Sequence, residues 1–159
     1  MTDGECTIRP AGAADVAAAG ELWQAMADQH AAYDAEAWSY RPDAKRRWCE
    51  EFASFLRQAD KILLVAEDGG EIVGVAVLAV EEPLVEMARR RGIVREVVVA
   101  EFARGRGVAT RLMDVAFEEM KARGAEEVVL HAALENATAV GFYEKLGMRR
   151  VMYRMYRKL

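Results

Sequence analysis

The chain has 159 residues, of which 53% are hydrophobic and 30% charged, a composition typical of a globular protein with a packed core. Its net charge of -4 provides no basic excess, which argues against nucleic acid as a partner. No run approaches the roughly 20 apolar residues that span a bilayer, and the first residues lack the pattern of an export signal. Two cysteines, Cys6 and Cys49, are too few for a disulfide framework. We therefore expect a single cytoplasmic domain over residues 1–159, with no membrane partner.

The first part of the chain predicts two helices joined by a loop. Apolar residues recur at helical spacing over residues 16–30, and Asp15 is placed to cap that helix. Residues 33–43 mix aromatic and charged side chains, with Pro42 near the end, which is typical of a loop or a broken helix. A second apolar helical face covers residues 44–58. Both helices therefore have one face suited to packing against a sheet.

Strand patterns follow the second helix. The β-branched runs 62–66 and 72–80 flank the sequence Glu-Asp-Gly-Gly, which predicts an antiparallel hairpin. Residues 81–92, which include Pro83, separate this hairpin from another β-branched run. That run predicts a third strand over residues 93–100.

The second half of the chain predicts a crossover connection. Helical spacing over residues 108–120, ended by a glycine, precedes a strand at 127–131. Because a helix joins them, the strands at 93–100 and 127–131 should be parallel, which makes the sheet mixed. A short helix over residues 137–146 and a terminal strand over 149–157 complete the pattern.

Two glycines and two arginines lie between the third strand and the helix after it. Backbone N–H groups at a helix start are unpaired within the helix and lie at the positive end of its dipole, so they can bind phosphate. Glycine lets the backbone approach such a ligand closely, although a glycine pair before a helix also fits a simple tight turn. The candidate anion-binding residues are Arg104, Gly105, Arg106, Gly107, Val108, Ala109 and Thr110.

The spacing within this loop distinguishes it from two common nucleotide-binding motifs. A Walker loop ends in Gly-Lys and then Ser or Thr, which this loop lacks, and Thr110 stands where the dinucleotide fingerprint has its third glycine. The segment instead resembles the Arg/Gln-x-x-Gly-x-Gly/Ala signature of the GNAT family of N-acetyltransferases, matched by Arg104, Gly107 and Ala109. Residues 136–148 resemble a second family pattern, Asn-x-x-Ala-x-x-Phe-Tyr-x-x-Leu-Gly-Phe.

The resemblance implies an α+β fold with a central mixed, mostly antiparallel sheet, helices on both faces and a parallel strand-helix-strand crossover at the cofactor loop. It implies acetyl-CoA as co-substrate, no metal, and direct acetyl transfer to a primary amine. The loop at residues 104–110 would hold the pyrophosphate, while the backbone of Val97, Val98 and Val99 would bond the cofactor arm. Asn136 would bond that arm, cap the helix that follows it, or both.

Three side chains are candidates for the proton transfers. An amine acceptor with a pKa near ~10.4 is protonated at neutral pH, so a base must take a proton from it. Glu96 lies on the strand before the loop and is a candidate base, or else a structural carboxylate paired with Arg95 or another arginine. Glu101 is a second candidate base. Tyr143 matches the family's general acid, which contacts the cofactor and protonates the departing thiolate, although its helical position also fits a core residue.

Other polar and aromatic residues have weaker assignments. Arginines 89–91 are predicted to meet an acidic substrate or the cofactor's ribose phosphate, or simply to be exposed. His30 and His131 are expected to be packed residues and not catalysts. A set of acidic and aromatic side chains suits a cationic acceptor but also fits a solvated loop. These residues are Tyr33, Asp34, Glu36, Trp38 and Tyr40.

Together these patterns predict an acetyl-CoA-dependent N-acetyltransferase that acts on a small-molecule or protein amine. One alternative is a catalytically silent acetyl-CoA-binding regulatory module of the same fold. Another is a phosphate-binding domain for a different nucleotide. A homodimer is a further prediction, which concerns the assembly of the protein.

Overall fold

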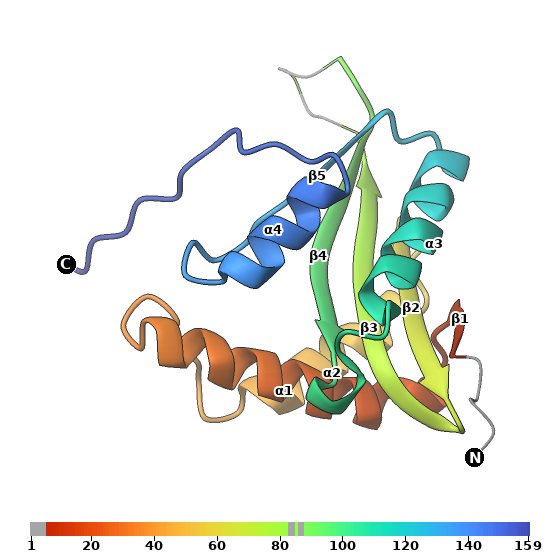
Figure 1. The fold of residues 1–159 in the computed structure, drawn as a ribbon, viewed down its shortest axis with the longest axis horizontal. Coiled ribbons are helices and arrows are strands. Elements are labelled where there is room, and N and C mark those ends of the chain that lie inside the picture. The colour runs from red at the N-terminus through yellow and green to blue at the C-terminus, as the bar shows by residue number, and fades with distance from the viewer. Residues whose placement is uncertain (1–5, 83–84, 86–87) are drawn as a thin grey trace.

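A five-stranded sheet forms the centre of the molecule (Figure 1). The computed structural model describes residues 6–82, 85 and 88–159, so Pro83 lies outside the described residues. The strands lie in the order of the chain: β1 (Thr7–Pro10), β2 (Lys61–Asp68), β3 (Glu71–Glu81), β4 (Arg91–Val99) and β5 (Glu127–Leu130). Neighbouring strands are antiparallel except β4 and β5, which are parallel. The predicted mixed, mostly antiparallel sheet is confirmed.

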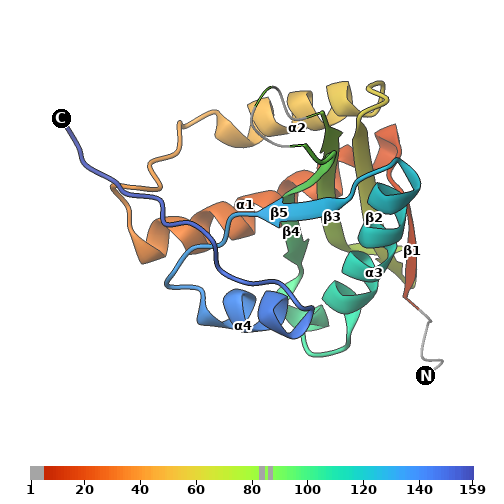
Figure 2. The same ribbon diagram turned by 90° about the horizontal axis from the view of Figure 1, so that it is seen from above.

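Helices cover both faces of this sheet (Figure 2). One face carries α1 (Val16–Tyr33) and α2 (Ala44–Phe55), and the other carries α3 (Val108–Ala122) and α4 (Ala137–Lys145). None of the helices in the described part of the chain is long and apolar enough to cross a membrane. The predicted helices are all present, with ends that differ from the prediction by a few residues.

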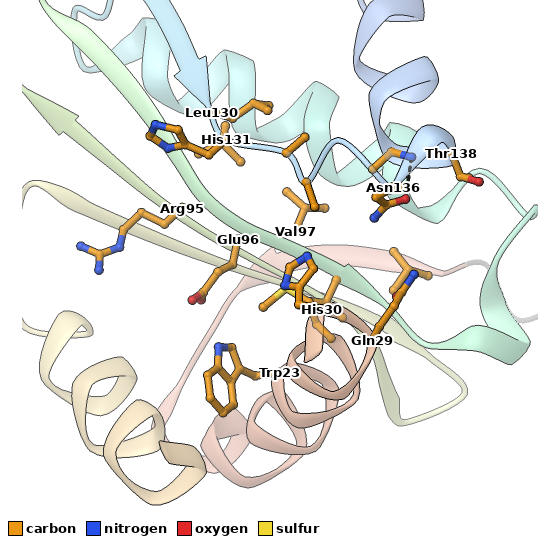
Figure 3. A pocket seen from close by; sticks show the side chains of 18 of the residues that line it. Trp23, Gln29, His30, Arg95, Glu96, Val97, Leu130, His131, Asn136 and Thr138 are labelled. Atoms are coloured by element: carbon orange, nitrogen blue, oxygen red, sulfur yellow. Dashed lines mark hydrogen bonds between the residues drawn. The ribbon is translucent and has the colours of Figure 1, made fainter. Parts of the chain in front are cut away.

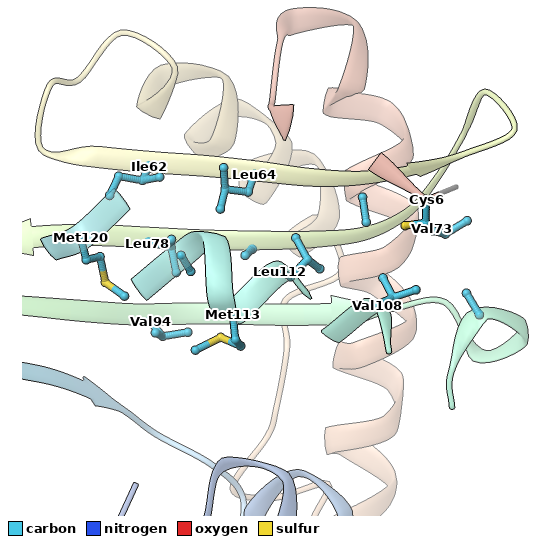
Figure 4. Packing of buried hydrophobic residues seen from close by; sticks show 14 of the residues in the cluster. Cys6, Ile62, Leu64, Val73, Leu78, Val94, Val108, Leu112, Met113 and Met120 are labelled. Atoms are coloured by element: carbon cyan, nitrogen blue, oxygen red, sulfur yellow. The ribbon is translucent and has the colours of Figure 1, made fainter. Parts of the chain in front are cut away.

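The sheet separates two hydrophobic clusters. Under α3, the side chains of Leu112, Met113 and Met120 pack against Leu64 and Leu78 of the central strands (Figure 4). These five side chains are almost fully buried, and burial of each contributes roughly 1.5–3 kcal/mol. Because both of its faces are covered, β3 is apolar along nearly its whole length, and not in alternation. The two clusters therefore hold the central strands firmly in place.

The turn between β2 and β3 explains their pairing. Gly69 and Gly70 have φ angles of 60° and 88°, a left-handed conformation that residues with a side chain rarely adopt. Two successive left-handed residues form the hairpin turn whose twist matches that of paired strands. The predicted antiparallel hairpin is confirmed.

Asp15 has a different role from the predicted one. It occupies the cap position of α1, but its side chain makes no hydrogen bond to the helix. Instead, its carboxylate accepts the Gly12 N–H at 2.7 Å and pairs with Arg9 at 2.8 Å. The Arg9 guanidinium holds the pKa of the Asp15 carboxyl below its usual range. This pair ties β1 to the start of α1, a contact that helix-capping rules do not predict.

The predicted terminal strand over residues 149–157 is wrong. Residues 148–159 have no regular secondary structure, and the segment runs away from the sheet (Figure 1). Val151, Met152, Tyr153 and Met155 are all exposed. Alternating side chains make a segment suited to a strand, but a strand forms only when a neighbour supplies hydrogen bonds. Within the described residues, the tail has no such neighbour.

Gly74 lets α3 lie close to the sheet, and its replacement by valine should destabilise the protein. A Cβ atom at Gly74 would lie 2.9 Å from Leu112 Cδ1 and 3.2 Å from the Ala66 Cβ. We expect Gly74→Val to lower the free energy of unfolding by about 1–3 kcal/mol, measured by urea denaturation. The control is Glu81→Val, at an exposed position on the same strand, with an effect within about 0.5 kcal/mol. Equal unfolding midpoints for the two variants would contradict this packing account.

Candidate functional site

A cleft of about 1360 Å³ opens beside β4, at the point where β5 ends. β4 pairs with β5 only over Arg91–Val94, opposite Glu127–Leu130. Along residues 95–99, β4 keeps β3 on one side, and no strand among the described residues pairs with its other edge. Single-ligand pockets commonly measure roughly 300–1000 Å³, so this cleft has room for two substrates together.

One end of the cleft is the start of α3. The first residue before the helix, Gly107, is left-handed with φ of 76°, and no side chain caps the helix. The first turn contains no acidic residue. The N–H groups of Val108, Ala109 and Thr110 therefore have no intrahelical partner and lie at the positive end of the helix dipole, as an anion site requires. All three residues line the cleft.

The two arginines of this loop have different positions. Arg104 lines the cleft and donates from Nε to the Val99 carbonyl oxygen at 3.1 Å, which braces the loop against the end of β4. Arg106 forms an ion pair with Asp68 at 2.9 Å and is not among the lining residues. Gly105, with φ of 75°, lines the cleft between them.

The β4 edge leads from α3 toward the middle of the cleft. Val98 packs in the cluster under α1 and α2, while Val97 and Val99 pack against the cluster under α3. Their side chains therefore belong to the core, and their contribution to the cleft is the unpaired backbone edge. An extended ligand can hydrogen-bond to such an edge in the manner of an added strand.

A β-bulge positions Glu96 in the middle of the cleft. Val77 of β3 lies opposite Glu96, but Leu78 lies opposite Val94, so Arg95 is an extra residue on β4. Bulges bend a strand and change the direction of side chains near functional sites. Figure 3 shows the Glu96 side chain projecting from β4 toward Trp23, away from the side where Asn136 lies.

The surroundings of Glu96 change its acidity. Burial raises the pKa of its carboxyl group, and the hydrogen bond that Trp48 Nε1 donates to Oε2 at 2.8 Å partly offsets this effect. No ion pair joins Glu96 to Arg95 or to another arginine in the described part of the chain, and the Arg95 guanidinium lies 3.6 Å from Glu51 and over the Phe55 ring. The charge of Arg95 nevertheless acts on Glu96 and helps to lower its pKa. Glu96 therefore faces the cleft as a partly buried carboxylate whose hydrogen-bond donor is the Trp48 N–H group.

The opposite wall of the cleft comes from α4. Asn136 caps this helix, since its Oδ1 accepts the Ala139 N–H at 3.0 Å, which confirms the structural half of its predicted role. Tyr143 lies about two turns along the helix from Asn136, lines the cleft, and packs against Phe142. Burial raises the pKa of Tyr143 to about 12, so its hydroxyl keeps its proton at neutral pH.

The predicted acceptor region divides into two parts. The aromatic residues Tyr33, Trp38 and Tyr40 line the cleft. The acidic residues do not: the Asp34 side chain accepts two backbone N–H groups in a tight turn, and Glu36 pairs with Lys158 at 3.3 Å. The aromatic part is thus available to a ligand, whereas the acidic part stabilises the loop and holds the tail.

Several other candidates lie outside the cleft. Glu101 and arginines 89–91 are not among its lining residues, and Arg91 pairs with Glu127 of β5 at 2.6 Å.

Both histidines, His30 and His131, line the cleft. Within the described residues, no group of three or more His, Cys, Asp or Glu side chains is arranged to hold a metal.

A family model described as the acetyltransferase (GNAT) family matches residues 23–148, which include β4, the α3 loop and α4. The chain belongs to the GNAT family. Members of this family use acetyl-CoA, and the protein is an acetyltransferase enzyme.

Two curated relatives illustrate this GNAT assignment. N-alpha-acetyltransferase 30 of Schizosaccharomyces pombe is 32% identical over 104 residues, which cover 64% of this chain and 68% of that protein. Glucosamine 6-phosphate N-acetyltransferase 1 of Oryza sativa is 35% identical over 107 residues, which cover 66% of this chain and 62% of that protein. The matches span about two thirds of the length of each relative.

Solved structures show the same GNAT fold. A point mutant of the BH1408 protein from Bacillus halodurans has a TM-score of 0.86 at 22% identity, and the match covers 96% of this chain and 99% of that one. An aminoglycoside N-acetyltransferase in complex with CoA has a TM-score of 0.78 at 16% identity, with 98% and 95% covered. At these identities the likeness establishes the fold alone.

Sequence reasoning missed two residues of this GNAT cleft, Trp23 and Trp48. Their helical spacing assigned them to the apolar faces of α1 and α2, and both are indeed buried. Yet both rings also line the cleft, and Trp48 donates the hydrogen bond to Glu96. No pattern in the sequence indicates that Trp48 lies beside a carboxylate 48 residues further along the chain.

Proposed function

We propose that this GNAT enzyme transfers the acetyl group of acetyl-CoA directly to a primary amine, carried by a small molecule or a protein. The supporting observation is that one cleft joins the uncapped start of α3 to a partly buried carboxylate, Glu96, and a partly buried phenol, Tyr143. A general phosphate-binding domain needs only the first of these features. A proton acceptor and a proton donor on facing walls are the groups that amine acylation requires.

The residues available for the cofactor fit its chemistry. The amides of Val108–Thr110 suit a pyrophosphate, because they are donors without partners at a helix start. The open edge at Val97–Val99 suits an amide-containing arm, since no strand among the described residues pairs with it along the cleft. Arg104, Gly105 and Asn136 complete the proposed cofactor contacts, whereas Arg106, which the sequence also suggested, is paired with Asp68 and does not line the cleft. When bound, acetyl-CoA supplies an acetyl group activated as a thioester.

The proposed proton transfers begin and end on this chain's own side chains. Glu96, as a carboxylate, takes a proton from the acceptor ammonium, directly or through water, and leaves the nitrogen lone pair free for attack. Tyr143 Oη would donate a proton to the sulfur as the bond between the sulfur and the acetyl carbon breaks, and the second proton that the acceptor nitrogen loses on becoming an amide would pass through water to the tyrosinate. Because burial raises the pKa of Tyr143 to about 12, the hydroxyl is protonated before this transfer.

The alternative of a silent regulatory module retains the cofactor site but needs neither Glu96 nor Tyr143 in the cleft. The test is release of free thiol from acetyl-CoA with a broad panel of amines. Turnover with any amine supports transfer. An enzyme that binds acetyl-CoA yet releases no thiol with any acceptor would support the module instead.

Cofactor binding can be tested by adding a charge at the start of α3. Thr110→Asp should keep the helix intact, because a carboxylate in the first turn stabilises a helix, but should repel a pyrophosphate. We expect the Kd for acetyl-CoA, measured by calorimetry, to rise about tenfold or more. The matched control is Thr110→Asn, which has the same shape without the charge and should change the Kd by less than about threefold. Equal affinities of the two variants would argue against a pyrophosphate at this helix.

We also propose a cytoplasmic location, which is supported by two free cysteines, Cys6 and Cys49, that need a reducing compartment to stay unoxidised. A homodimer stays a prediction. Light scattering of the purified protein measures its mass in solution directly.

A further inference from the structure

Two tryptophan rings from different helices lie beside the Glu96 carboxylate. Trp23 of α1 and Trp48 of α2 are both buried, and they are stacked with centroids 5.8 Å apart and planes 19° apart. Trp48 Nε1 donates to Glu96 Oε2 at 2.8 Å. Figure 3 shows the ring nitrogen of Trp23 on the side of that ring that faces Glu96. Both indole N–H groups are therefore close to one carboxylate.

The two indoles act on Glu96 in the same direction. Burial raises the pKa of the Glu96 carboxyl, and hydrogen bonding from Trp48 and, more weakly, from Trp23 lowers it. An indole N–H group can only donate, so its favourable partner here is the charged carboxylate and not the neutral acid. Trp23 thus supports the effect of the Trp48 hydrogen bond.

The charged groups around Glu96 largely oppose each other. Besides burial and the indoles, the charge of Arg95 lowers the pKa of Glu96 and that of Glu51 raises it. These two side chains pair with each other at 3.6 Å. Tyr40, from the loop between α1 and α2, meets Trp23 edge-on at 5.6 Å, and burial and the charge of Glu96 raise its pKa, so its hydroxyl adds no charge at neutral pH.

Neutral donors suit a carboxylate that must bind a cation. A guanidinium paired directly with Glu96 would favour the charged form but would also compete with an ammonium group for the same oxygens. An indole N–H group stabilises the charged form and fixes its orientation without adding a positive charge. The carboxylate then keeps its full negative charge for the ammonium group of the acceptor.

We propose that Trp23 is a second positioning residue for Glu96, and that the stacked pair holds the carboxylate in one orientation through two neutral N–H donors. We call Trp23 and Trp48 the indole clamp. The role of the clamp in catalysis rests on the proposed function, in which Glu96 is the base. A base works best when its orientation is fixed by groups that are themselves held by packing, and both rings pack in the cluster between the helices and the sheet.

The N–H signals of the native protein test the clamp directly. The chain has three tryptophans, Trp23, Trp38 and Trp48, and each gives one indole signal in a nitrogen–proton NMR spectrum. We expect the Trp23 and Trp48 signals to move with one common midpoint as Glu96 ionises, and this movement should vanish in Glu96→Gln. Trp38, which stacks on His30, is the internal control, because any movement of its signal should persist in Glu96→Gln. A Trp23 signal that does not follow Glu96 overturns the inference.

A conservative variant separates the donor from the packing. Trp23→Phe keeps a stacked ring but loses the N–H group, so the pKa of Glu96 should rise. We expect the acidic limb of the kcat/KM profile to move to higher pH by about half a unit, and further in the double variant with Trp48→Phe. An unmoved limb in Trp23→Phe overturns the inference.

The matched control is Phe52→Leu. The Phe52 ring packs against Trp48 with centroids 5.0 Å apart and carries no donor. This variant should lower the melting temperature and leave the acidic limb in place within about 0.2 pH unit. Equal shifts of the limb in Phe52→Leu and Trp23→Phe would show that packing alone is responsible, and would reject the role of the Trp23 donor.

Failure of this inference differs from failure of the proposed function. The NMR titration needs neither acetyl-CoA nor an amine. If an amine is acetylated while the Trp23 signal does not follow Glu96, the proposed function stands and the inference is rejected. If both indole signals follow Glu96 but no amine releases thiol from acetyl-CoA, the proposed function is rejected and the clamp stands as a contact of Glu96 without a catalytic role.

Discussion

The Tyr143→Phe enzyme is expected to turn over about 100-fold or more slowly than the native enzyme, which is the typical contribution of a general acid. Burial raises the pKa of Tyr143 to about 12, so the native hydroxyl holds its proton throughout the range in which the enzyme would work. Phenylalanine fills the same space in the cleft wall and removes only that proton. The measurement is kcat from thiol release at saturating acetyl-CoA and amine.

A control variant shows whether the loss of kcat is specific to Tyr143. Tyr153→Phe makes the same chemical change in the exposed tail, where the side chain is 73% exposed, and should leave kcat unchanged. The Kd for acetyl-CoA should stay within about threefold in Tyr143→Phe, because most contacts of the proposed cofactor site involve the backbone. A native kcat in Tyr143→Phe would show that another group, or water, protonates the sulfur.

Glu96→Gln should lower kcat/KM at neutral pH by about 100-fold or more and should also change the pH profile. A base acts only when deprotonated, so the native rate rises as pH increases through the pKa of Glu96 and is level above it. Because burial raises that pKa, the rise should lie at higher pH than for an exposed glutamate. Glutamine cannot titrate, so this limb of the profile should disappear.

Two further variants separate the roles around Glu96. Trp48→Phe removes a hydrogen bond that favours the charged carboxylate, so the pKa of Glu96 rises further and the acidic limb moves to higher pH. Glu101→Gln alters the other candidate base, which does not line the cleft, and should leave the profile unchanged. Loss of activity in Glu101→Gln, with a native profile in Glu96→Gln, would transfer the role of base to Glu101.

Local patterns in the sequence predicted most of the fold. Helical spacing, the double glycine at positions 69 and 70, and the crossover rule each depend on residues close together in the chain, and the structure confirms these elements. The prediction of a terminal strand was wrong because a strand depends on more than its own residues. Alternation over residues 149–157 is a local property, whereas pairing depends on a neighbour that only the folded chain brings near or leaves out.

Local motifs likewise predicted some parts of the candidate site, while other parts depend on contacts between distant residues. Gly105, Gly107 and the helix after them stand next to one another in the sequence, so an anion site at the start of α3 was predictable from short spacings. The resemblance likewise placed Tyr143 and Asn136 by motif. In contrast, the position of Tyr40 and Trp38 beside rings of α1 and the pairing of Glu36 with Lys158 depend on contacts between separate elements, which no local pattern encodes.

By itself, the sequence determined the helices, the five strands of the sheet and the left-handed turn at Gly69 and Gly70, because backbone preference and capping act over a few residues. It also indicated the loop that we propose binds an anion. Only the tertiary structure decided that β5 ends early and leaves the edge of β4 open, and that Trp48 meets Glu96. It also decided the acidity of Glu96 and Tyr143, since desolvation is the sum of contacts from elements far apart in the chain.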